Sequence, residues 1–433
     1  MKPYLIIKLK EPARFEFIPH WTDFIKDKSH SVEKFNNRID EVIDQYKLDY
    51  WITQEYKPKS GDQFNGDEIQ YGLNRIYRLI FKDNIHLPEN LVNEISMIPL
   101  VEEVRSGAIG QTDLPQPSKA MAFDLMSDRA REIIYLKQAQ LFSKGHPDIN
   151  VAVLDTGVDL EHPELQGVIK KKADFVNIDG LDSSAFIGDT LGFDEIPQDE
   201  VGHGTHVSGI IAGKGLRMPE GVAPRCSIMA VRVLATLQQG DKRVGAGLID
   251  NINVGIKWAV DNGADVINMS LGVKHEYGGL PHEEVIKYAL GKGVTIVAAS
   301  GNDGTNDKYY PGALPGVLAI GAVNDTGSIA DFSNYGVVTL VAPGTNIYSS
   351  FMDRNYAFCS GTSQAAPFVS GGIALLKSFA LQNGYRLKDN QVKYLLKHTS
   401  DKPDTQFKTT RSGYGKLNLV DALKLLKYQS NYS

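Results

Sequence analysis

Residues 149–155 read INVAVLD, an almost unbroken apolar run that ends in an aspartate. Five further runs of this kind follow, and helical stretches such as residues 247–262 and 281–292 separate several of them. Apolar strands that alternate with helices are typical of a parallel sheet covered on both faces. We therefore predict a doubly wound, mostly parallel α/β fold over residues 125–433. The five runs are SIMAVRVL (227–234), ADVINMSLG (264–272), VTIVAAS (294–300), GVLAIGAV (316–323) and VVTLVAPG (337–344).

The first 110 residues carry a different pattern. Their order of strand, helix, strand, helix and strand, with one further strand, predicts a small α+β domain over residues 1–110. Residues 111–120 read QTDLPQPSKA, and this polar stretch with two prolines predicts a linker over residues 111–124. The expected elements of the first domain are strands at 4–10, 50–55, 76–82 and 100–105 and helices at 31–46 and after Pro88.

The composition is that of an ordinary globular protein. The 433 residues are 42% hydrophobic, and 46 basic against 52 acidic residues leave a net charge of −6, which gives no reason to expect a nucleic-acid partner. The apolar run from Tyr4 to Ile7 is too short for a signal peptide, and no stretch reaches the roughly 18 apolar residues that span a bilayer. We therefore expect a cytoplasmic protein without a membrane partner. Cys226 and Cys359 lack metal-ligand spacing and predict no disulfide scaffold.

Three motifs put reactive side chains where catalytic groups of such sheets gather, at the carboxyl ends of strands and in the following loops. VAVLDTGVD ends a buried strand at Asp155, whose carboxylate is well placed to hold an imidazole in one tautomer. VGHGTHVSG puts His203 between two glycines at the start of a helix, where the backbone can approach closely. CSGTSQAAP puts Ser363 at the start of an apolar helix, whose unpaired N–H groups favour a developing oxyanion.

Each motif alone is an ordinary structural feature: a strand-end cap, a glycine turn or a helix N-cap. Together, in the order Asp155, His203 and Ser363 on an α/β pattern, they indicate a catalytic triad. VAASGNDG adds Asn302 in a glycine-flanked loop after a buried strand, where its amide would complete an oxyanion hole with the Ser363 N–H. The sequence therefore predicts a serine endopeptidase that forms an acyl-enzyme and needs no cofactor for its chemistry.

Residues 125–425 resemble the subtilisin-like serine peptidases throughout. The resemblance is carried by DTG, GHGTHVSG, SGN and GTSQAAP around the four residues above, and by GVAP, INMSLG, YPGALPGVLAIGAV and VAPG in the same order. It implies a peptide substrate that binds as an extra strand between two edges. The implied substrate-binding residues are Gly245, Ala246 and Gly247 on one edge, Ser270, Leu271 and Gly272 on the other, and Ala299, Ser300 and Gly301 in the pocket wall.

The N-terminal domain resembles the inhibitory propeptide of the same family, most clearly in LPENLVNEISMIPLVEEVRSG at residues 87–107. This resemblance implies a folding aid and autoinhibitor whose C-terminal tail lies in the active-site cleft until it is cut. The enzyme would then be made as a zymogen, with its own N-terminal domain as an intramolecular inhibitor. Self-cleavage is expected within residues 106–127.

Two stretches bear on metal binding. Many family members hold calcium with an Asn-containing loop after the helix of the catalytic histidine, but here residues 213–221 read GKGLRMPEG, and Glu164 stands where an Asp ligand is usual. Because hard cations need several convergent oxygens, the pattern argues against this calcium site and predicts no metal ligand, while a structural calcium stays an open alternative. The acidic stretch 174–200 is a second candidate for a cation or for basic substrates, and a water-facing loop is the expectation.

Two side chains near the predicted site leave alternatives open. Tyr309 stands where the family often has a small residue at the base of the specificity pocket. A phenol there would favour small or medium side chains, Asp303 would favour a basic one, and a Tyr309 turned into the fold would do neither. Cys359 is expected to be a buried, inert thiol, with a redox or metal-poisoning role as the alternative.

Two other classes of protein fit part of the pattern. An aspartic peptidase would use Asp155 and Asp325, which both lie in Asp-Thr-Gly sequences. Against it, the polar surroundings of Asp325 indicate a surface turn, and His203 and Ser363 would have no role. The other class is a binding protein on a peptidase fold, kept shut by an N-terminal domain that is never released.

Overall fold

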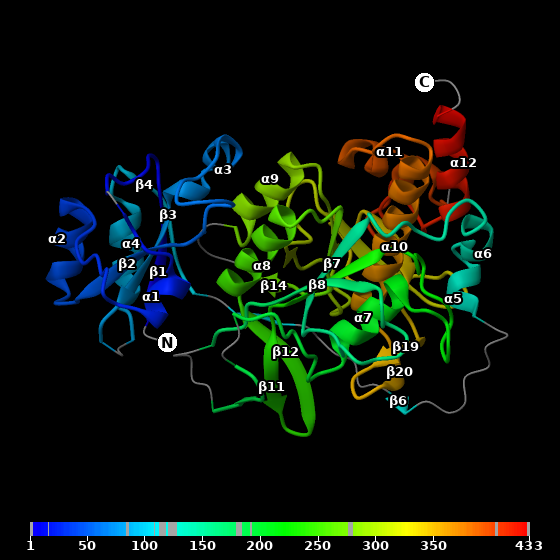
Figure 1. Cartoon of the computed structure of the whole chain (residues 1–433), viewed down its shortest axis with the longest axis horizontal. Helices are drawn as coiled ribbons and strands as arrows, with labels where there is room; N and C mark the ends of the chain where they lie inside the picture. The colour runs from blue at the N-terminus through cyan, green and yellow to red at the C-terminus, as the bar shows by residue number, and fades with distance from the viewer. Residues whose placement is uncertain are drawn as a thin grey trace.

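The computed structural model of the chain describes residues 3–15, 17–83, 86–107, 109–111, 118–119, 128–178, 184–190, 193–275, 280–402 and 406–430. The first part of the chain builds a small four-stranded sheet, and the rest builds a larger sheet flanked by helices (Figure 1). Among the described residues, no helix combines the length and the apolar character that crossing a membrane requires.

The larger sheet has seven strands, and each neighbouring pair runs parallel. Strand β7, which lies in the interior of the sheet between β13 and β10, ends at Asp155, and β15 ends just before the loop that carries Asn302. The carboxyl ends of parallel strands lie at one edge of a sheet, so these two loops share that edge. In spatial order the strands are β18 (Leu340–Pro343), β17 (Leu318–Val323), β15 (Thr295–Ala299), β13 (Val266–Met269), β7 (Asn150–Asp155), β10 (Ser227–Arg232) and β8 (Ile169–Asp174).

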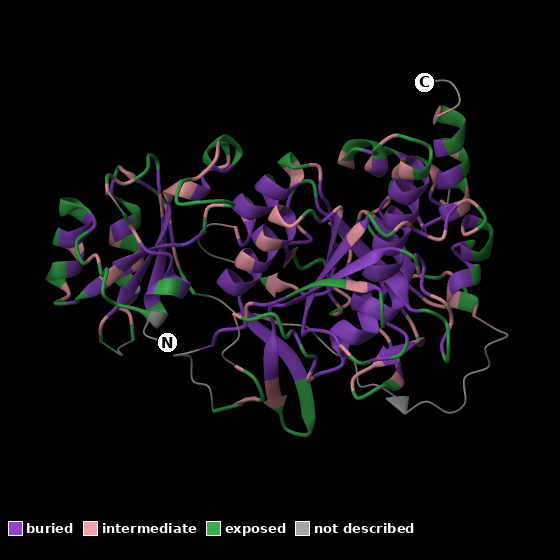
Figure 2. Cartoon of the chain, in the orientation of Figure 1, coloured by how far each residue is buried: buried purple, intermediate pink, exposed green. Residues whose placement is uncertain are grey.

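Side chains of β7 alternate between two hydrophobic cores, as the two-residue period of a strand requires. Val151 and Val153 join the core that contains α7 (His203–Ala212) and α10 (Thr362–Gln382). Ala152 and Leu154 join the core that contains α8 (Ile249–Asp261) and α9 (Glu283–Gly291). Figure 2 shows α10 and most strands of this sheet buried, whereas the edge strand β8 is exposed along its first half. The predicted α/β fold with helices on both faces is confirmed.

Helix α10 is buried along nearly its whole length because small residues let other elements approach it. A Cβ atom added at Gly371 would lie 2.6 Å from Cβ of Val222, and one at Gly372 would lie 2.4 Å from Cδ2 of Leu419. A helix that is apolar all round belongs inside a protein rather than on its surface. This packing fixes the position of the helix whose first turn contains Ser363.

The remaining elements of the larger part are short or lie at its margins. Four of these strands form two hairpins, β11–β12 and β19–β20, which the apolar runs did not indicate. The bounds are α5 Arg129–Glu132, α6 Leu136–Ala139, β9 Phe186–Ile187, β11 Ala235–Gln239, β12 Lys242–Leu248, β14 Val273–Lys274, β16 Tyr309–Tyr310, β19 Ile347–Phe351, β20 Asn355–Cys359, α11 Asp389–Thr399 and α12 Leu419–Ser430.

The N-terminal domain is an antiparallel sheet with the spatial order β2-β3-β1-β4. One face of this sheet packs against α2 and α4 in a core of its own. The elements are β1 Tyr4–Leu9, α1 Trp21–Lys26, α2 Asn37–Gln45, β2 Tyr50–Gln54, α3 Gly66–Gln70, the 3₁₀ turn Leu73–Arg75, β3 Ile76–Phe81, α4 Glu89–Ser96 and β4 Val101–Ser106.

The other face of the small sheet packs against the larger part of the chain. Tyr4, Ile6 and Ile80 belong to the same hydrophobic core as Ile252 of α8 and Val285 of α9. Figure 1 shows α8 and α9 between the two sheets. The first domain therefore shares a continuous apolar core with the second instead of touching it only through polar surface.

The expected helix over residues 31–46 is too long by six residues at its start. Val32 forms an isolated bridge with Ile52 instead, and Asn36 accepts a hydrogen bond from the Arg38 N–H at 3.1 Å. A side-chain acceptor at this position is an N-cap, so α2 begins at Asn37. Most of the expected linker, residues 111–124, lies outside the described residues.

The expectation that residues 174–200 form a water-facing acidic loop is wrong at both of its ends. Asp174 is 0% exposed and accepts a hydrogen bond from Arg232 Nη1 at 2.7 Å, and Arg232 is only 1% exposed. Asp199 is 4% exposed. Sequence alone cannot distinguish a solvated carboxylate from one whose donors come from distant segments. Asp179 and Asp182 lie outside the described residues.

Candidate active site

Asp155 and His203 form a buried pair between the end of β7 and the start of α7. Oδ1 of Asp155 accepts hydrogen bonds from His203 Nδ1 at 2.6 Å and from the Thr156 N–H at 2.8 Å. Both side chains are 0% exposed. A carboxylate at Nδ1 keeps the ring proton there, which leaves Nε2 of a neutral imidazole as the basic nitrogen.

The surroundings of His203 favour its protonated form. Burial by itself would lower the pKa of His203, but the Asp155 carboxylate, its hydrogen bond and the charge of Asp199 raise that pKa above its ordinary value. His203 Nε2 has no hydrogen-bond partner among the described residues. The imidazole is therefore held at one nitrogen and open at the other, as a general base has to be.

Ser363 is the second residue of α10, directly after Gly361 and Thr362. Its side chain is buried, and its Oγ donates a hydrogen bond to the Ser270 carbonyl oxygen at 3.1 Å rather than to His203. Hydrogen bonds between catalytic groups are often loose without substrate, so this geometry does not argue against the predicted pairing. A χ1 rotation of Ser363 would release the hydroxyl from the Ser270 carbonyl.

Asn302 follows β15 in a loop whose Gly301 has φ of +105°, a conformation that favours glycine. Its Oδ1 accepts hydrogen bonds from the Thr362 N–H at 2.8 Å and from the Thr362 hydroxyl at 2.9 Å. Because its oxygen is engaged at the start of α10, the Nδ2 amide is left as the donor. That amide lies 3.5 Å from the position of a Cβ atom at Gly361, so it borders the turn before Ser363.

The first predicted substrate edge lies within β12, and the second directly follows β13. Gly245, Ala246 and Gly247 belong to β12, which pairs with β11 on one side and with β5 (Ile109–Gln111) on the other. In that second pairing Ala246 lies opposite Gln111 and Gly247 opposite Gly110. The predicted edge is thus occupied by the chain's own segment, which follows the N-terminal domain.

The second edge, Ser270, Leu271 and Gly272, directly follows β13 and is tied to the nucleophile's backbone. Ser270 Oγ donates to the Ser363 carbonyl oxygen at 2.8 Å, and Asn268 Nδ2 donates to Ser270 Oγ at 3.0 Å. Ser270 and Leu271 are buried. Sequence reasoning placed Ser270 in a substrate edge and did not anticipate this bond to Ser363.

Tyr309 closes the space between the second edge and the predicted pocket wall of Ala299, Ser300 and Gly301. A Cβ atom at Gly301 would lie 2.7 Å from Tyr309 Cδ2, and one at Gly272 would lie 3.1 Å from Tyr309 Cδ1. The phenol donates to Asp303 Oδ2 at 2.7 Å, and Lys274 forms an ion pair with Asp303 at 2.8 Å. The Asp303 carboxylate is therefore already paired with the Tyr309 hydroxyl and the Lys274 ammonium group.

Comparisons with known proteins agree with this geometry. Residues 146–416 match the family model described as the subtilase family, Peptidase S8. This chain belongs to the subtilase family. By family and by fold it is a subtilisin-like serine peptidase.

Two relatives and one solved structure illustrate the similarity. The thermophilic serine proteinase of Bacillus sp. strain AK1 is 37% identical over 295 residues, which span 67% of this chain and 65% of that protein. The major intracellular serine protease of Bacillus subtilis strain 168 is 37% identical over 267 residues, 59% of this chain and 78% of the relative. The structure of the prenylagaramide maturation protease PagA is 33% identical, with a TM-score of 0.54, and covers 67% of this chain and 98% of its own.

Two cysteines of this subtilase are free and buried. Burial raises the pKa of the Cys359 thiol to about 12, which keeps it protonated at neutral pH. Reactive cysteines need thiolate character and access. The geometry therefore agrees with the inert thiol expected at this position.

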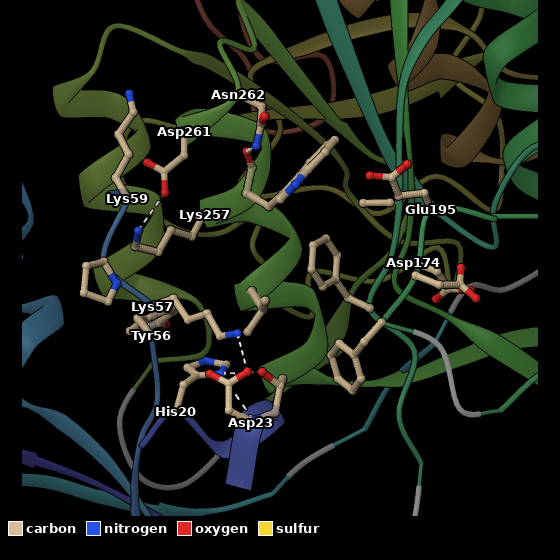
Figure 3. Close-up of a pocket in the computed structure, with 18 of the residues that line it drawn as sticks. His20, Asp23, Tyr56, Lys57, Lys59, Asp174, Glu195, Lys257, Asp261 and Asn262 are labelled. Carbon is tan, nitrogen blue, oxygen red and sulfur yellow. Dashed lines mark hydrogen bonds and ion pairs between the residues drawn. The ribbon is translucent and has the colours of Figure 1, made fainter. Parts of the chain in front are cut away.

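A cleft opens between the N-terminal domain and α8, away from the residues described above (Figure 3). Tyr56, Lys57 and Lys59 line it from the N-terminal side, and Lys257 and Asp261 line it from α8. Lys257 donates to Asp261 Oδ2 at 2.7 Å across one helical turn. The cleft belongs to the domain interface and not to the predicted active site.

The carboxylate of Glu164 occupies the position where the family pattern suggested a calcium ligand, and its oxygens are already engaged. Oε2 accepts from the N–H groups of Gly215 and Leu216 at 2.8 and 3.0 Å, and Oε1 accepts from the Arg217 N–H at 2.6 Å. The Tyr356 hydroxyl donates to Oε1 at 3.3 Å. Donors that point at both oxygens do not fit a cation, which needs free lone pairs there.

We predict that Glu164→Gln lowers the free energy of unfolding by about 2–4 kcal/mol, because an amide donor would then face one of the backbone N–H groups in a buried site. Chemical denaturation of a Ser363→Ala background, which avoids self-digestion, measures the change. Glu161→Gln is the matched control, because the Glu161 side chain is 71% exposed.

Addition of a calcium chelator should change the stability of the Glu164 and Glu164→Gln chains by the same amount. A chelator effect that is present with Glu164 and lost in Glu164→Gln would contradict this account of the loop.

Proposed function

We propose that this subtilase hydrolyses peptide bonds with Asp155, His203 and Ser363 as its catalytic triad and Asn302 as an oxyanion-hole donor. The observation that carries the proposal is the 2.6 Å hydrogen bond between Asp155 and His203 in a setting closed to water. A buried carboxylate at Nδ1 with an open Nε2 is the arrangement of a serine-activating histidine. The position of Ser363 in the first turn of α10 supports the same assignment.

In the proposed reaction, His203 Nε2 takes the Ser363 proton as Oγ attacks the substrate carbonyl carbon. Asp155 keeps the imidazole oriented and stabilises its positive charge. The Asn302 amide and the Ser363 N–H donate to the oxyanion, and His203 returns the proton to the leaving amine. Water then attacks the acyl-enzyme by the same proton route. No cofactor takes part in these steps.

Ser363→Ala should lower the peptidase rate by about four orders of magnitude or more, since the nucleophile is removed while binding and oxyanion groups remain. The same substitution should abolish self-cleavage. The unsubstituted chain and Ser363→Ala are incubated side by side, and new termini are mapped by mass spectrometry. A new terminus within residues 106–127 is expected only in the chain with Ser363.

The outcome also separates the rival functions. A purified chain that neither cuts itself nor hydrolyses peptides would favour a binding protein on a peptidase fold. A chain that resists a serine-directed fluorophosphonate and is blocked by a pepstatin-like analogue would favour an aspartic peptidase.

The N-terminal domain is proposed to act as an intramolecular inhibitor. The support comes from the segment that follows it, because β5 pairs with the substrate edge of β12 and β6 (Ser118–Lys119) pairs with β20. Strand β20 ends four residues before Ser363. The connecting chain is thus attached to backbone on two elements next to the proposed site, where a substrate would otherwise bind as a strand.

A buried charge cluster supports tight docking of this domain. Asp250, in the first turn of α8, accepts from the Tyr4 hydroxyl at 2.5 Å and from Arg105 Nη1 at 3.1 Å. Arg78 lies 3.8 Å from the same carboxylate and forms two hydrogen bonds with Glu55, at 2.9 and 3.0 Å. Burial tends to raise the pKa of Asp250, but Arg105 and Arg78 hold it below its ordinary value, so the carboxylate is charged.

Asp250→Asn should weaken docking by about 3–5 kcal/mol, a factor of roughly 10²–10⁴ in the docking equilibrium, because buried Arg105 loses its closest anion and buried Arg78 keeps only Glu55. Fluorophosphonate labelling of Ser363 in the uncut chain, followed by intact-mass spectrometry, should then be faster. Asp325→Asn is the matched control, because Asp325 is exposed on the turn that follows β17. Equal labelling rates in the two variants would count against inhibition by docking.

We also propose a preference for small side chains before the cut bond, since the Tyr309 ring fills the space between Gly272 and Gly301. Tyr309→Ala should shift kcat/KM toward phenylalanine and leucine at that position, about tenfold or more relative to alanine. Cleavage of a peptide library measures the change, with Tyr394→Ala as an exposed tyrosine control. A starting preference for phenylalanine or leucine, or for lysine and arginine, would refute the idea.

An intracellular place of action is the last part of the proposal. One relative is a major intracellular serine protease, and both buried cysteines of this chain are free thiols. Fractionation of cells that produce the full-length protein would test it.

A further inference from the structure

Close to the proposed Asp155–His203 pair lies a third buried carboxylate, Asp199, which the mechanism above does not use. We infer that Asp199 is a positioning residue that ties the turn after Asp155 to the first turn of α7 and so sets the Asp155–His203 distance. The inference rests on the proposed triad. It assigns a role to a residue that never touches the substrate.

Both oxygens of the Asp199 carboxylate accept hydrogen bonds from described residues. Oδ1 accepts from the N–H groups of Val201 and Gly202 at 3.0 and 2.8 Å and from the Thr156 hydroxyl at 2.9 Å. Oδ2 accepts from the N–H and the hydroxyl of Thr205, at 2.9 and 2.6 Å. Burial raises the pKa of Asp199 above its ordinary value, while five donors and no acceptor favour the ionised carboxylate and hold it in place from both sides.

The two threonines carry the connection onward. The Thr156 hydroxyl donates to Asp199 and accepts from the Gly204 N–H of α7 at 3.0 Å. The Thr205 hydroxyl donates to Asp199 and accepts from the Asp159 N–H at 2.8 Å. Each hydroxyl therefore bridges the carboxylate to a backbone group of the opposite segment, so the strand-end turn and the helix share one set of bonds.

The backbones at this junction are in close contact. A Cβ atom at Gly204 would lie 2.1 Å from the Gly157 carbonyl oxygen and 3.0 Å from Cβ of Asp155. Only glycine permits the helix to approach the turn this closely. The contact leaves little freedom for His203, which precedes Gly204, to move relative to Asp155. A misplacement of about 1 Å between catalytic groups can cost roughly a hundredfold in rate.

Asp199 also acts on His203 through its charge. The charges that act on the imidazole are those of Asp155 and Asp199, and the other titratable ring on the same helix is His206. Burial lowers the pKa of His206 to about 3, so that ring is neutral near pH 7 and leaves the two carboxylates as the charges that His203 experiences. Removal of the Asp199 charge should therefore lower the pKa of His203, whereas loss of a threonine hydroxyl should not.

The test compares variants of the full chain after self-cleavage, with active sites counted by fluorophosphonate titration. Thr156→Val should lower kcat per titrated site about ten- to a hundredfold with little change in KM, and Thr156→Ser, which keeps the hydroxyl, should restore it to within about twofold. Thr295→Val is the control, because Thr295 is buried and its hydroxyl has no partner among the described residues.

Asp199→Asn adds a readout that a purely structural role would not move. The acid limb of the kcat/KM profile reports the pKa of the catalytic histidine in the free enzyme, and it should shift to lower pH in this variant. In Thr156→Val the charge remains and the acid limb should stay in place. If Asp199→Asn does not fold, the two Thr156 variants still decide the positioning role.

The inference fails if Thr156→Val keeps the kcat of the unsubstituted enzyme per titrated site, or if Thr156→Ser and Thr156→Val lose equally. An acid limb that does not move in folded Asp199→Asn would also overturn it. A starting enzyme that takes no fluorophosphonate label would instead remove the proposed function, which is a different and separately visible result.

Discussion

The hydrogen bond from His203 Nδ1 to Asp155 Oδ1 is the interaction on which the arrangement of this subtilase depends. It joins the end of the interior strand β7 to the start of a buried helix, and no water competes for it because both side chains are fully buried. Such a bond is strong only while the two backbones stay in register. Two sets of contacts keep the backbones of β7 and α7 in place relative to each other. The apolar core on one face of β7 packs against α7, and the hydrogen bonds around Asp199 fix the first turn of α7.

Much of the fold could be predicted because its signals are local. The run at 149–155 has an apolar residue at almost every position, which only a strand buried on both faces requires, and the end of that run places Asp155 at the sheet edge. The strands at 50–55, 76–82 and 100–105 were predicted to within about one residue of β2, β3 and β4. The start of α2 was missed although Asn36, a preferred N-cap residue, marks it in the sequence.

What could not be predicted depends on contacts between distant segments. Asp199 reads as one more acid in an acidic stretch, and its role appears only when Thr156, which is 43 residues away, donates to it. The hairpin β11–β12 lacks a long apolar run because the residues near its turn are exposed in both strands, and the pairing of its β12 edge with β5 joins distant parts of the chain. Charge patterns in sequence show which residues are ionisable and do not show which of them are buried against donors.

The loop around Glu164 has a further consequence for how this protein's stability responds to its surroundings. A bound ion contributes to stability through mass action, so the contribution rises and falls with the concentration of the free ion. At this loop the carboxylate is instead satisfied by three peptide N–H groups of the same chain. Because these donors belong to the same chain, their effective concentration at Glu164 is fixed. A change in ambient calcium therefore leaves their contribution to folding unaltered.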